Sequence, residues 1–567
     1  MVKKVYQVIT SKYFLLLLYL LVLLDGGGFK SHTPFFAIFL SLLYISTAIR
    51  MRGYLLVEKR EVIFWKVLIL VGGLLSVFVG IDKGESVYGF FRLIAILAVG
   101  IAVQQMEDDK KTFFIKTIPF MGLLLMAGCL FRDFSLFKEW VSLSGRINGS
   151  FKYSNTMALF LMIGIISAEH LFERGKRMLQ IVLAFGVLGT GSRTAFVLLC
   201  CYFIFCFFRY KGKNKYALLV FAGIAGLIGL ITAFGGNLYG ASRFLELNIN
   251  ASTFQGRLLY WEDAVRMLLK RPLGLGYMGY FYLQQAEQTG VYSVRFVHNE
   301  WLQWILDYGI LAGIGLVAYL IIQCRKSRIS ALGEEILCLI TVYSFFDFHL
   351  QFFAVIIIVL LVIPRGNMTW RCGQGSLKEG ICKYSLLAGM ALSIWLCASI
   401  GIAECYEKVG NFEQAVKWNP FSAQYKQNYL LQSKDLTTAD AYADKLLEDN
   451  QYLYPAYLIK SNAAAQTGNL SSFIENREQV LHLRKYKNDE YEDYFLILYG
   501  WYLEACGKGD IQEIRKCRDA MKEIQVLLME TKRKTSIRAY RIQEKPELKF
   551  KKEYLNLMEQ MEENTDE

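Results

Sequence analysis

The sequence lacks several motifs that mark common functional classes. Its twelve cysteines contain no CxxC pair and most lie in apolar runs, so the pattern indicates neither a zinc site nor a disulfide framework. No Walker motif is present, so a nucleotide-hydrolysing phosphate loop is not predicted. The first apolar run is followed by DGGGFKSHTP rather than by a small-residue cleavage site, which favours a retained signal-anchor.

What the sequence does contain is long apolar segments. Hydrophobic residues make up 54% of the 567 residues, which is too high a share for a soluble protein. Apolar runs of near-spanning length recur from residue 13 to about residue 402 and then stop. We therefore predict an all-α protein in which a polytopic membrane domain, 1–403, precedes a separate helical domain, 404–567. The net charge of +13 comes from short loops between spans and does not predict binding to nucleic acid.

The loops between the apolar runs alternate in charge. Loops rich in Lys and Arg, such as 50–60, 174–177 and 209–215, define the cytoplasmic side. By that rule two long loops, about 132–154 and 235–297, lie outside together with the C-terminal domain. About twelve to thirteen spans are expected, beginning near residues 13, 34, 62, 86, 112, 155, 178, 194, 216, 298, 333, 350 and 384.

Two arginines on the predicted outer side differ from ordinary loop residues. Arg193 lies in the tight TGSR turn between two apolar runs, where a charge needs a partner. Phosphate suits it better than a carboxylate, because a guanidinium binds phosphate oxygens bidentately. Arg257 belongs to an amphipathic segment, GRLLYWEDAVRMLLK, and we expect it in the first turn, where helix N-termini bind anions. The glycines of the following PLGLG could cradle phosphate, but a turn that ends the helix is the simpler interpretation.

Two histidines are predicted at the outer ends of spans. His298 enters a helix together with Asn299 and Glu300, and three polar side chains at a membrane boundary favour a working site. His349 lies in FDFHLQ beside Asp347. There the sequence leaves a structural Asp–His hydrogen bond and a catalytic role equally open.

The C-terminal domain contains a repeat. Gly-Asn turns occur at 410–411 and 468–469, and Pro455 follows Pro420 by thirty-five residues. This pattern resembles degenerate tetratricopeptide repeats, which stack helix pairs into a concave binding surface. The repeats predict a protein partner, although a nonspecific helical bundle is the alternative.

Several segments, in chain order, are similar to motifs of the O-antigen ligase and polymerase family. They are NGSFKYSNTMA at 148–158, TGSRTA at 190–195, GRLLYWEDA at 256–264, PLGLGY at 272–277 and HNEWLQWILDYGILAG at 298–313. The FDFHLQ turn also resembles the branch of that family that carries tetratricopeptide repeats. The resemblance extends over about 148–352.

This resemblance implies a multi-pass glycosyltransferase of a bacterial cytoplasmic membrane. It implies that Arg193 and Arg257 bind pyrophosphate, that His298 is catalytic and that the outer loop at about 235–297 is the catalytic loop. The accessory candidates are Asn155, Arg271, Asn299, Asp347 and His349. The donor is expected to be a glycan on undecaprenyl diphosphate, and the acceptor a glycan, a wall polymer or a lipid. Because the diphosphate is already a good leaving group, we expect an inverting reaction that needs no metal or other cofactor.

The sequence leaves other functions open. The same fold would serve a polymerase, a ligase or a protein O-glycosyltransferase. A flippase for the lipid-linked glycan would need charged residues along a path at the bilayer midplane, for which Lys66, Arg92 and Lys116 are the candidates. A noncatalytic scaffold would leave the arginines and His298 without a purpose.

Overall fold

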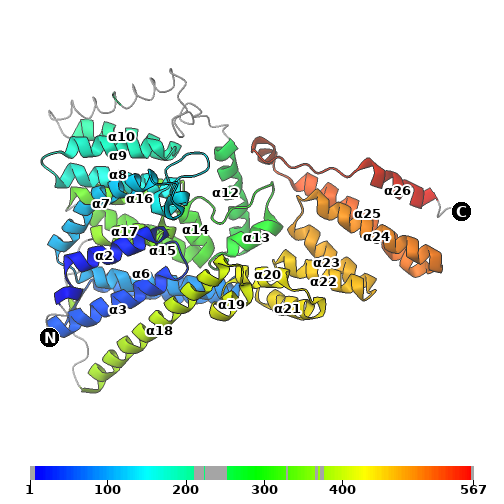
Figure 1. The fold of residues 1–567 in the computed structure, drawn as a ribbon, viewed down its shortest axis with the longest axis horizontal. Helices are drawn as coiled ribbons and strands as arrows, with labels where there is room; N and C mark the ends of the chain where they lie inside the picture. The colour runs from blue at the N-terminus through cyan, green and yellow to red at the C-terminus, as the bar shows by residue number, and fades with distance from the viewer. Residues whose placement is uncertain are drawn as a thin grey trace.

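The computed structural model describes residues 7–209, 223, 252–326, 330–363, 368–370 and 376–563. This part of the chain is helical except for a short sheet, in which β1 (Leu55–Val57) pairs antiparallel with β2 (Met368–Trp370). The predicted all-α class is confirmed, and the protein is a polytopic membrane protein. Figure 1 shows a bundle of roughly parallel and antiparallel helices with a helical tail that extends from one end.

The bundle contains helices near twelve of the thirteen predicted starts, and the start near 216 lies outside the described residues. Within the described residues, six helical segments are long and apolar enough to cross a membrane. They are α3 (Thr33–Arg52), Glu61–Val79, α6 (Lys83–Gln104), α7 (Asp108–Cys129), α8 (Ser154–Leu171) and the Gly380–Lys408 part of α18 (Ser376–Lys408). The segment Glu61–Val79 comprises α4 (Lys59–Val67), a π-helical stretch (Leu68–Leu74) and α5 (Leu75–Val79). Shorter bundle helices are α2 (Lys12–Leu24), α9 (Lys176–Gly189), α10 (Arg193–Arg209), α14 (Glu300–Tyr308), α15 (Ile310–Lys326), α16 (Ala331–Tyr343) and α17 (Phe353–Val362).

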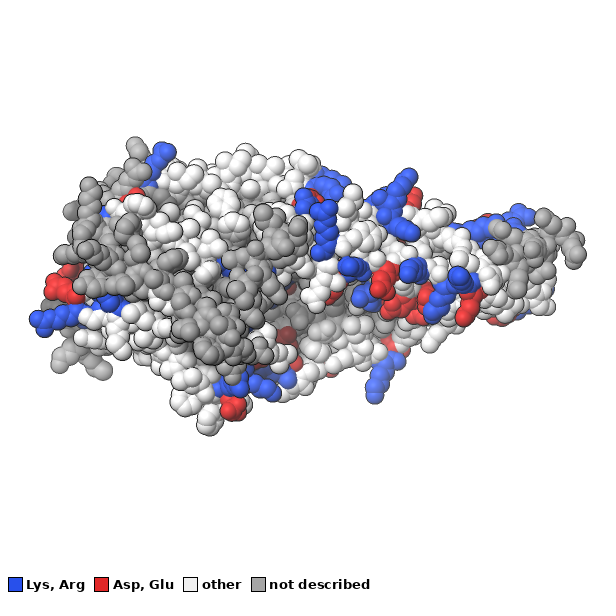
Figure 2. All heavy atoms as spheres, turned by 90° about the horizontal axis from the view of Figure 1, so that it is seen from above, with Lys and Arg blue, Asp and Glu red and all other residues white. Residues whose placement is uncertain are grey.

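The loops predicted to be basic meet at one end of this bundle. Glu335 pairs there with His170 at 2.9 Å and with Arg209 at 3.6 Å. Lys111 donates to the backbone oxygen of Ile363 at 3.2 Å. Figure 2 shows charged side chains at this tip and over the tail, with a largely uncharged surface on the bundle between them. The alternation of the loops in the sequence is therefore an alternation between the two ends of the bundle.

The tail begins within α18, which continues without a break across residue 404. It contains α19 (Phe412–Trp418), α20 (Ala423–Gln432), α21 (Leu436–Asp449), α22 (Tyr454–Gln466), α23 (Leu470–Leu483), α24 (Asn488–Lys508), α25 (Ile511–Lys534) and α26 (Lys552–Glu563). Consecutive helices from α18 to α26 contact one another. Gly410 and Gly468 adopt positive φ at the two predicted Gly-Asn turns. The predicted helix pairs are thus present, and their assignment as tetratricopeptide repeats stays a prediction.

The tail packs against the end of the bundle opposite the basic loops. Lys83 donates to the backbone oxygen of Glu448 at 2.8 Å, and Asn450 donates to Asp82 at 3.0 Å. Further along, the Lys485 ammonium donates to the backbone oxygen of Ala286 at 2.6 Å. Ala286 lies in α13 (Gly279–Glu287), which, with α12 (Ser252–Lys270), separates the bundle from the tail (Figure 1). The membrane domain and the tail are therefore joined by direct polar contacts.

One expected span is broken into two helices. The apolar run that begins near residue 298 forms two helices, α14 and α15, which meet at Gly309. Gly309 has φ 88° and ψ 164°, a conformation that is essentially restricted to glycine. The break frees backbone groups inside the bundle, and PLGLG satisfies them: Leu275 N–H donates to Leu306 O at 2.6 Å and Ile310 N–H to Pro272 O at 3.1 Å.

Cys382 is disulfide-bonded, contrary to the expectation from the cysteine pattern.

The PLGLG stretch is therefore a structural joint rather than a phosphate cradle. It ends α12 at Lys270, as predicted. Gly274, Gly276 and Gly279 also match GxGxxG in letters, but they follow a helix, whereas the dinucleotide fingerprint must follow a strand. A Cβ on Gly274 would lie 2.6 Å from Gly309 N, so the two backbones can approach only through glycine.

We expect Gly309→Ala to destabilise the protein by about 1–3 kcal/mol, because alanine is strained in this backbone conformation. Its Cβ would also lie 2.6 Å from the backbone oxygen of Leu273. Thermal unfolding in detergent micelles measures the loss. Gly401→Ala in α18 is the control, since a Cβ there meets nothing within 4 Å. Equal stability of the two variants would contradict the role of the joint.

A histidine ties the α2–α3 loop to the base of the tail. His32 lies between Asp25, 2.8 Å from its Nε2, and Glu404, 3.0 Å from its Nδ1. Burial alone would lower the pKa of His32, but hydrogen bonds and attraction to the two carboxylates outweigh it and raise the pKa to about 9. A raised pKa means that this contribution to stability is fully present below the ordinary value of about 6.5.

The contribution should be lost as the pH rises through about 9. We expect the Tm to fall between pH 7 and pH 10 and the fall to be smaller in His32→Gln, which cannot titrate. A pH series of thermal unfolding for both proteins checks this. Parallel pH profiles would show that His32 does not carry the dependence.

Candidate active site

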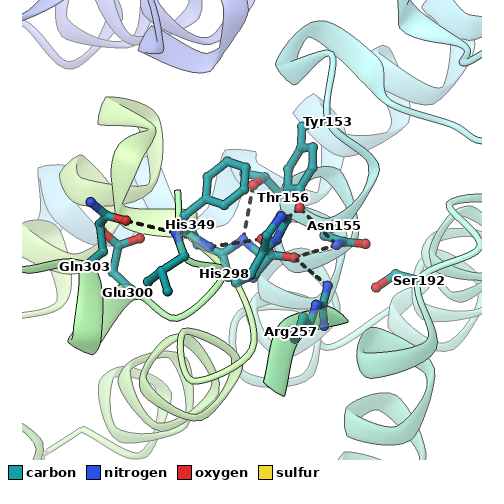
Figure 3. A network of polar contacts seen from close by, with 12 residues as sticks. Tyr153, Asn155, Thr156, Ser192, Arg257, His298, Glu300, Gln303 and His349 are labelled. Atoms are coloured by element: carbon teal, nitrogen blue, oxygen red, sulfur yellow. Dashed lines mark hydrogen bonds and ion pairs between the residues drawn. The ribbon is translucent and has the colours of Figure 1, made fainter. Parts of the chain in front are cut away.

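A buried carboxylate gathers residues from four separate segments. Asp347 is completely buried and accepts hydrogen bonds from Tyr153 Oη at 2.7 Å and from Asn155 Nδ2. Its two oxygens also face His298 Nδ1 at 3.2 Å and Arg257 Nη2 at 3.4 Å. We call these five residues the Asp347 cluster, and Figure 3 shows the side chains of Tyr153, Asn155, Arg257 and His298 converging. The chain thereby brings together residues that are up to 194 positions apart in sequence.

The turn that carries Asp347 is recessed within the bundle. α17 follows this turn and has only 10 residues, so it rises about 15 Å, half of the roughly 30 Å hydrocarbon core of a bilayer. Its far end, Ile363, contacts Lys111 at the end of the bundle with the basic loops. The turn between α16 and α17 therefore lies below the opposite rim, where a charged group needs protein partners.

Two further residues fix this turn. Arg92 is buried and donates from Nη2 to the backbone oxygen of Leu350 at 2.6 Å. Glu300 is fully buried and accepts from Leu350 N–H at 3.0 Å and from Gln351 Nε2 at 2.7 Å. Because Glu300 follows His298 by two residues, it holds the Asp347 turn in register with His298.

The environment keeps Asp347 ionised. Burial alone would raise the pKa of Asp347, but the hydrogen bond from His298 and electrostatic attraction to His298 and Arg257 lower it well below its ordinary range. His298 has a positive φ of 53°, which turns its ring toward this carboxylate. With Nδ1 held by Asp347, Nε2 is the nitrogen left to accept a proton, and no described residue bonds it.

His349 is not the partner of Asp347, although the two are close in sequence. The His349 ring is completely buried, and its Nδ1 lies 3.1 Å from Thr156 Oγ1. Burial, together with the positive charge of Arg257, lowers the pKa of His349 to about 4, so it is neutral at physiological pH. The predicted alternative of an Asp347–His349 hydrogen bond is therefore wrong, and Asp347 bonds His298 instead.

The two predicted pyrophosphate arginines occupy different parts of the site. Arg257 is in contact with Asp347, but α12 already begins by Ser252, so the expectation that Arg257 lies in the first helical turn is wrong. Arg193 is the first residue of α10. Its turn is linked to the cluster by Arg146, which donates to Thr190 O at 2.7 Å and to Asn155 Oδ1 at 3.1 Å.

Of the three accessory candidates other than Asp347 and His349, two have structural roles and one is part of the cluster. Asn155 is part of the Asp347 cluster. Asn299 caps α14, where its side chain accepts from Leu302 N–H at 3.1 Å. Arg271 lies outside the cluster, because its Nη2 donates to Tyr452 Oη of the tail at 3.0 Å.

Sequence reasoning did not single out Tyr153 or Arg146 as a site residue. The signal for Tyr153 was its position two residues before Asn155 in the matched NGSFKYSNTMA segment. Among the described residues, no group of three His, Cys, Asp or Glu side chains is arranged to hold a metal ion.

Residues 178–320 match the O-antigen ligase family. The match confirms the family resemblance, and it includes Arg193, Arg257 and His298 but not Asp347. No curated protein matches the chain. The O-antigen ligase match indicates a membrane enzyme that transfers glycans and acts on lipid-linked substrates, and it leaves the tail unassigned.

The Asp347 cluster should be energetically coupled. We expect Asp347→Asn to cost about 3 kcal/mol, because it leaves buried donors and the charge of Arg257 without their partner. In a double-mutant cycle with Arg257→Gln, the coupling should be about 1 kcal/mol or more. The exposed pair Glu413 and Lys417, 2.7 Å apart on α19, is the control and should couple by about 0.5 kcal/mol or less. Additive effects at Asp347 and Arg257 would contradict a coupled cluster.

Proposed function

We propose that this protein is an inverting glycosyltransferase that moves a glycan from undecaprenyl diphosphate to an acceptor hydroxyl. The reaction takes place at the outer face of a bacterial cytoplasmic membrane. The arrangement of His298 and Arg257 around one buried carboxylate is the main support for the proposal, because it places a general base beside an arginine that can bind an anion. The diphosphate already activates the sugar, so the reaction needs no nucleotide and no metal.

His298 is the general base. Its Nε2 removes the proton of the acceptor hydroxyl as the oxygen attacks the anomeric carbon from the side opposite the diphosphate. The imidazolium that forms is stabilised by Asp347, which holds Nδ1 and fixes the ring. Such a positioned base contributes roughly a hundred- to ten-thousand-fold in rate.

Arg257 and Arg193 bind the departing diphosphate. The contact of Arg257 with Asp347 is long, 3.4 Å, and uses only Nη2, which leaves further N–H donors for phosphate oxygens. A preorganised donor of this kind contributes on the order of 3 kcal/mol to the transition state. The carbon–oxygen bond to the diphosphate breaks, and the negative charge passes to the carrier rather than to the protein.

The positive-inside rule supports the outer location of the site. The basic loops meet at the opposite end of the bundle from the Asp347 cluster, so that end is assigned to the cytoplasm. The tail packs against the same end as the cluster and is therefore extracytoplasmic. A protein partner bound through the tail's repeats would then act from outside the cell membrane.

The charged residues within the spans favour an enzyme over a flippase. Lys66 and Lys116 are exposed on the outside of the bundle and do not line an internal path. Arg92 is buried but holds the Asp347 turn through Leu350. The choice among ligase, polymerase and protein O-glycosyltransferase depends on the acceptor.

Purified protein in nanodiscs, supplied with an undecaprenyl-diphosphate oligosaccharide, tests this function. We expect His298→Ala to lower kcat about a hundred- to ten-thousand-fold and Arg257→Ala about a hundred- to a thousand-fold. Arg271→Ala is the matched arginine control and should keep activity within a few-fold, because Arg271 contacts the tail. The assay follows release of the lipid diphosphate and the size of the glycan product.

A lengthening ladder of products identifies a polymerase, and release that requires an added lipid, wall polymer or peptide identifies a ligase or protein glycosyltransferase. Full transfer by properly inserted His298→Ala and Arg257→Ala variants would contradict the assignment of these two residues to the active site. Transbilayer movement of the donor without release of the diphosphate would instead support a flippase.

A further inference from the structure

A cavity lies where the tail meets the membrane domain. Its volume is about 270 Å³, near the lower end of the range of roughly 300–1,000 Å³ for ligand pockets. We call it the junction pocket. The membrane domain contributes the α2–α3 loop, the start of α6 and the segment before His298, and the tail side contributes the end of α18 and the start of α20. Its lining includes Phe29, Tyr88, Arg295, Glu404, Phe421 and Tyr425.

The junction pocket holds a donor group and an acceptor atom that lack hydrogen-bond partners. The Arg295 guanidinium stacks over the rings of Phe29 and Phe296, at 5.2 Å and 5.7 Å, and no described residue accepts a hydrogen bond from it. On the opposite side, Glu404 binds His32 through Oε2, while its Oε1 is buried without a hydrogen-bond partner. Unpartnered donors and acceptors around one cavity indicate a ligand that supplies both.

The remaining lining narrows the chemistry of that ligand. A simple anion would be repelled by the carboxylates of Glu404 and Glu407, and a simple cation by Lys30, Arg295 and Lys408. A hydrocarbon chain would leave these groups unsatisfied. A sugar ring presents hydroxyls that donate and accept, together with C–H faces that pack against aromatic rings. We propose that the junction pocket binds a saccharide unit of the acceptor.

The position of the junction pocket relative to the Asp347 cluster suits an acceptor subsite. Phe29 stacks on Phe352 at 4.9 Å, and Phe352 lies at the end of the turn that carries Asp347. Arg295 precedes His298 by three residues, with the buried Phe296 between them. An acceptor glycan anchored in the pocket would therefore extend from the tail side toward the base. This inference rests on the proposed function.

The proposal also assigns a task to the tail. Glu404, Phe421 and Tyr425 belong to α18 and to the start of the tail, so the pocket is incomplete without them. The first tail helices would then select the acceptor, while the later ones remain available for a protein partner.

Two substitutions test the pocket without touching the Asp347 cluster. Arg295→Gln removes the unpartnered guanidinium, and Phe421→Ala removes a ring that is already 37% exposed. The controls are Arg515→Gln, exposed on α25, and Leu431→Ala, 52% exposed on α20. Full-length protein in nanodiscs is titrated with the oligosaccharide that mild acid releases from the lipid-linked donor, and binding is followed by calorimetry. We expect the Kd to rise at least tenfold in both pocket variants and to stay unchanged in the controls.

Steady-state transfer provides the second measurement. We expect the KM for a glycan acceptor to rise at least tenfold in the pocket variants, with kcat and the KM for the donor unchanged. A rise in the donor KM alone would overturn the acceptor assignment, as would displacement of the oligosaccharide by an acceptor peptide. Absence of oligosaccharide binding to the unmodified protein, or equal binding by all variants, would overturn the pocket itself. Loss of binding in the pocket variants without any transfer activity would uphold a saccharide site while refuting the proposed function.

Discussion

The arrangement of the site depends on one buried charge. An isolated carboxylate within a membrane protein is expensive, so Asp347 is stable only because several donors reach it at once. Those donors come from the start of α8, from α12, from the loop before α14 and from the turn of Asp347 itself. Each donor fixes the position of its own segment. The charge of Asp347 therefore both orients His298 and holds together elements that no local sequence signal connects.

Such a charge can be placed there because the helices around it are interrupted. A set of uniformly spanning helices would bury only apolar side chains at this depth. Instead α17 is short, and Gly309 divides the preceding run into α14 and α15. Each interruption exposes backbone groups that must be satisfied within protein. The PLGLG joint meets this need at Gly309, and Arg92 and Glu300 meet it at the Asp347 turn.

Sequence patterns predicted the parts of this architecture that depend on local composition. Hydropathy located helix starts, and alternating charge grouped the loops. Polar residues at apolar boundaries gave His298 and Arg193 as candidates, and an amphipathic segment gave Arg257. What the sequence could not provide was pairing at long range. Asp347 and His349 are neighbours in the chain, but a 3₁₀ turn, His349–Gln351, directs them to different partners. For the same reason Arg271 pairs with Tyr452, which lies 181 positions away in the tail.

In the proposed reaction, the contact between tail and membrane domain gives the tail a place in the chemistry as well as in recognition. The segment from Arg295 to His298 has one face in the junction pocket and the other on Asp347. Phe296, Phe348 and Phe352 pack between these two faces, with Phe296 and Phe348 at 5.0 Å, so their relative position is set by a rigid aromatic layer. Occupation of the pocket need not move the base. In the proposed reaction, occupation of the pocket fixes the distance from the bound saccharide to His298. The geometry of the acceptor glycan then determines which of its hydroxyls can reach the anomeric carbon.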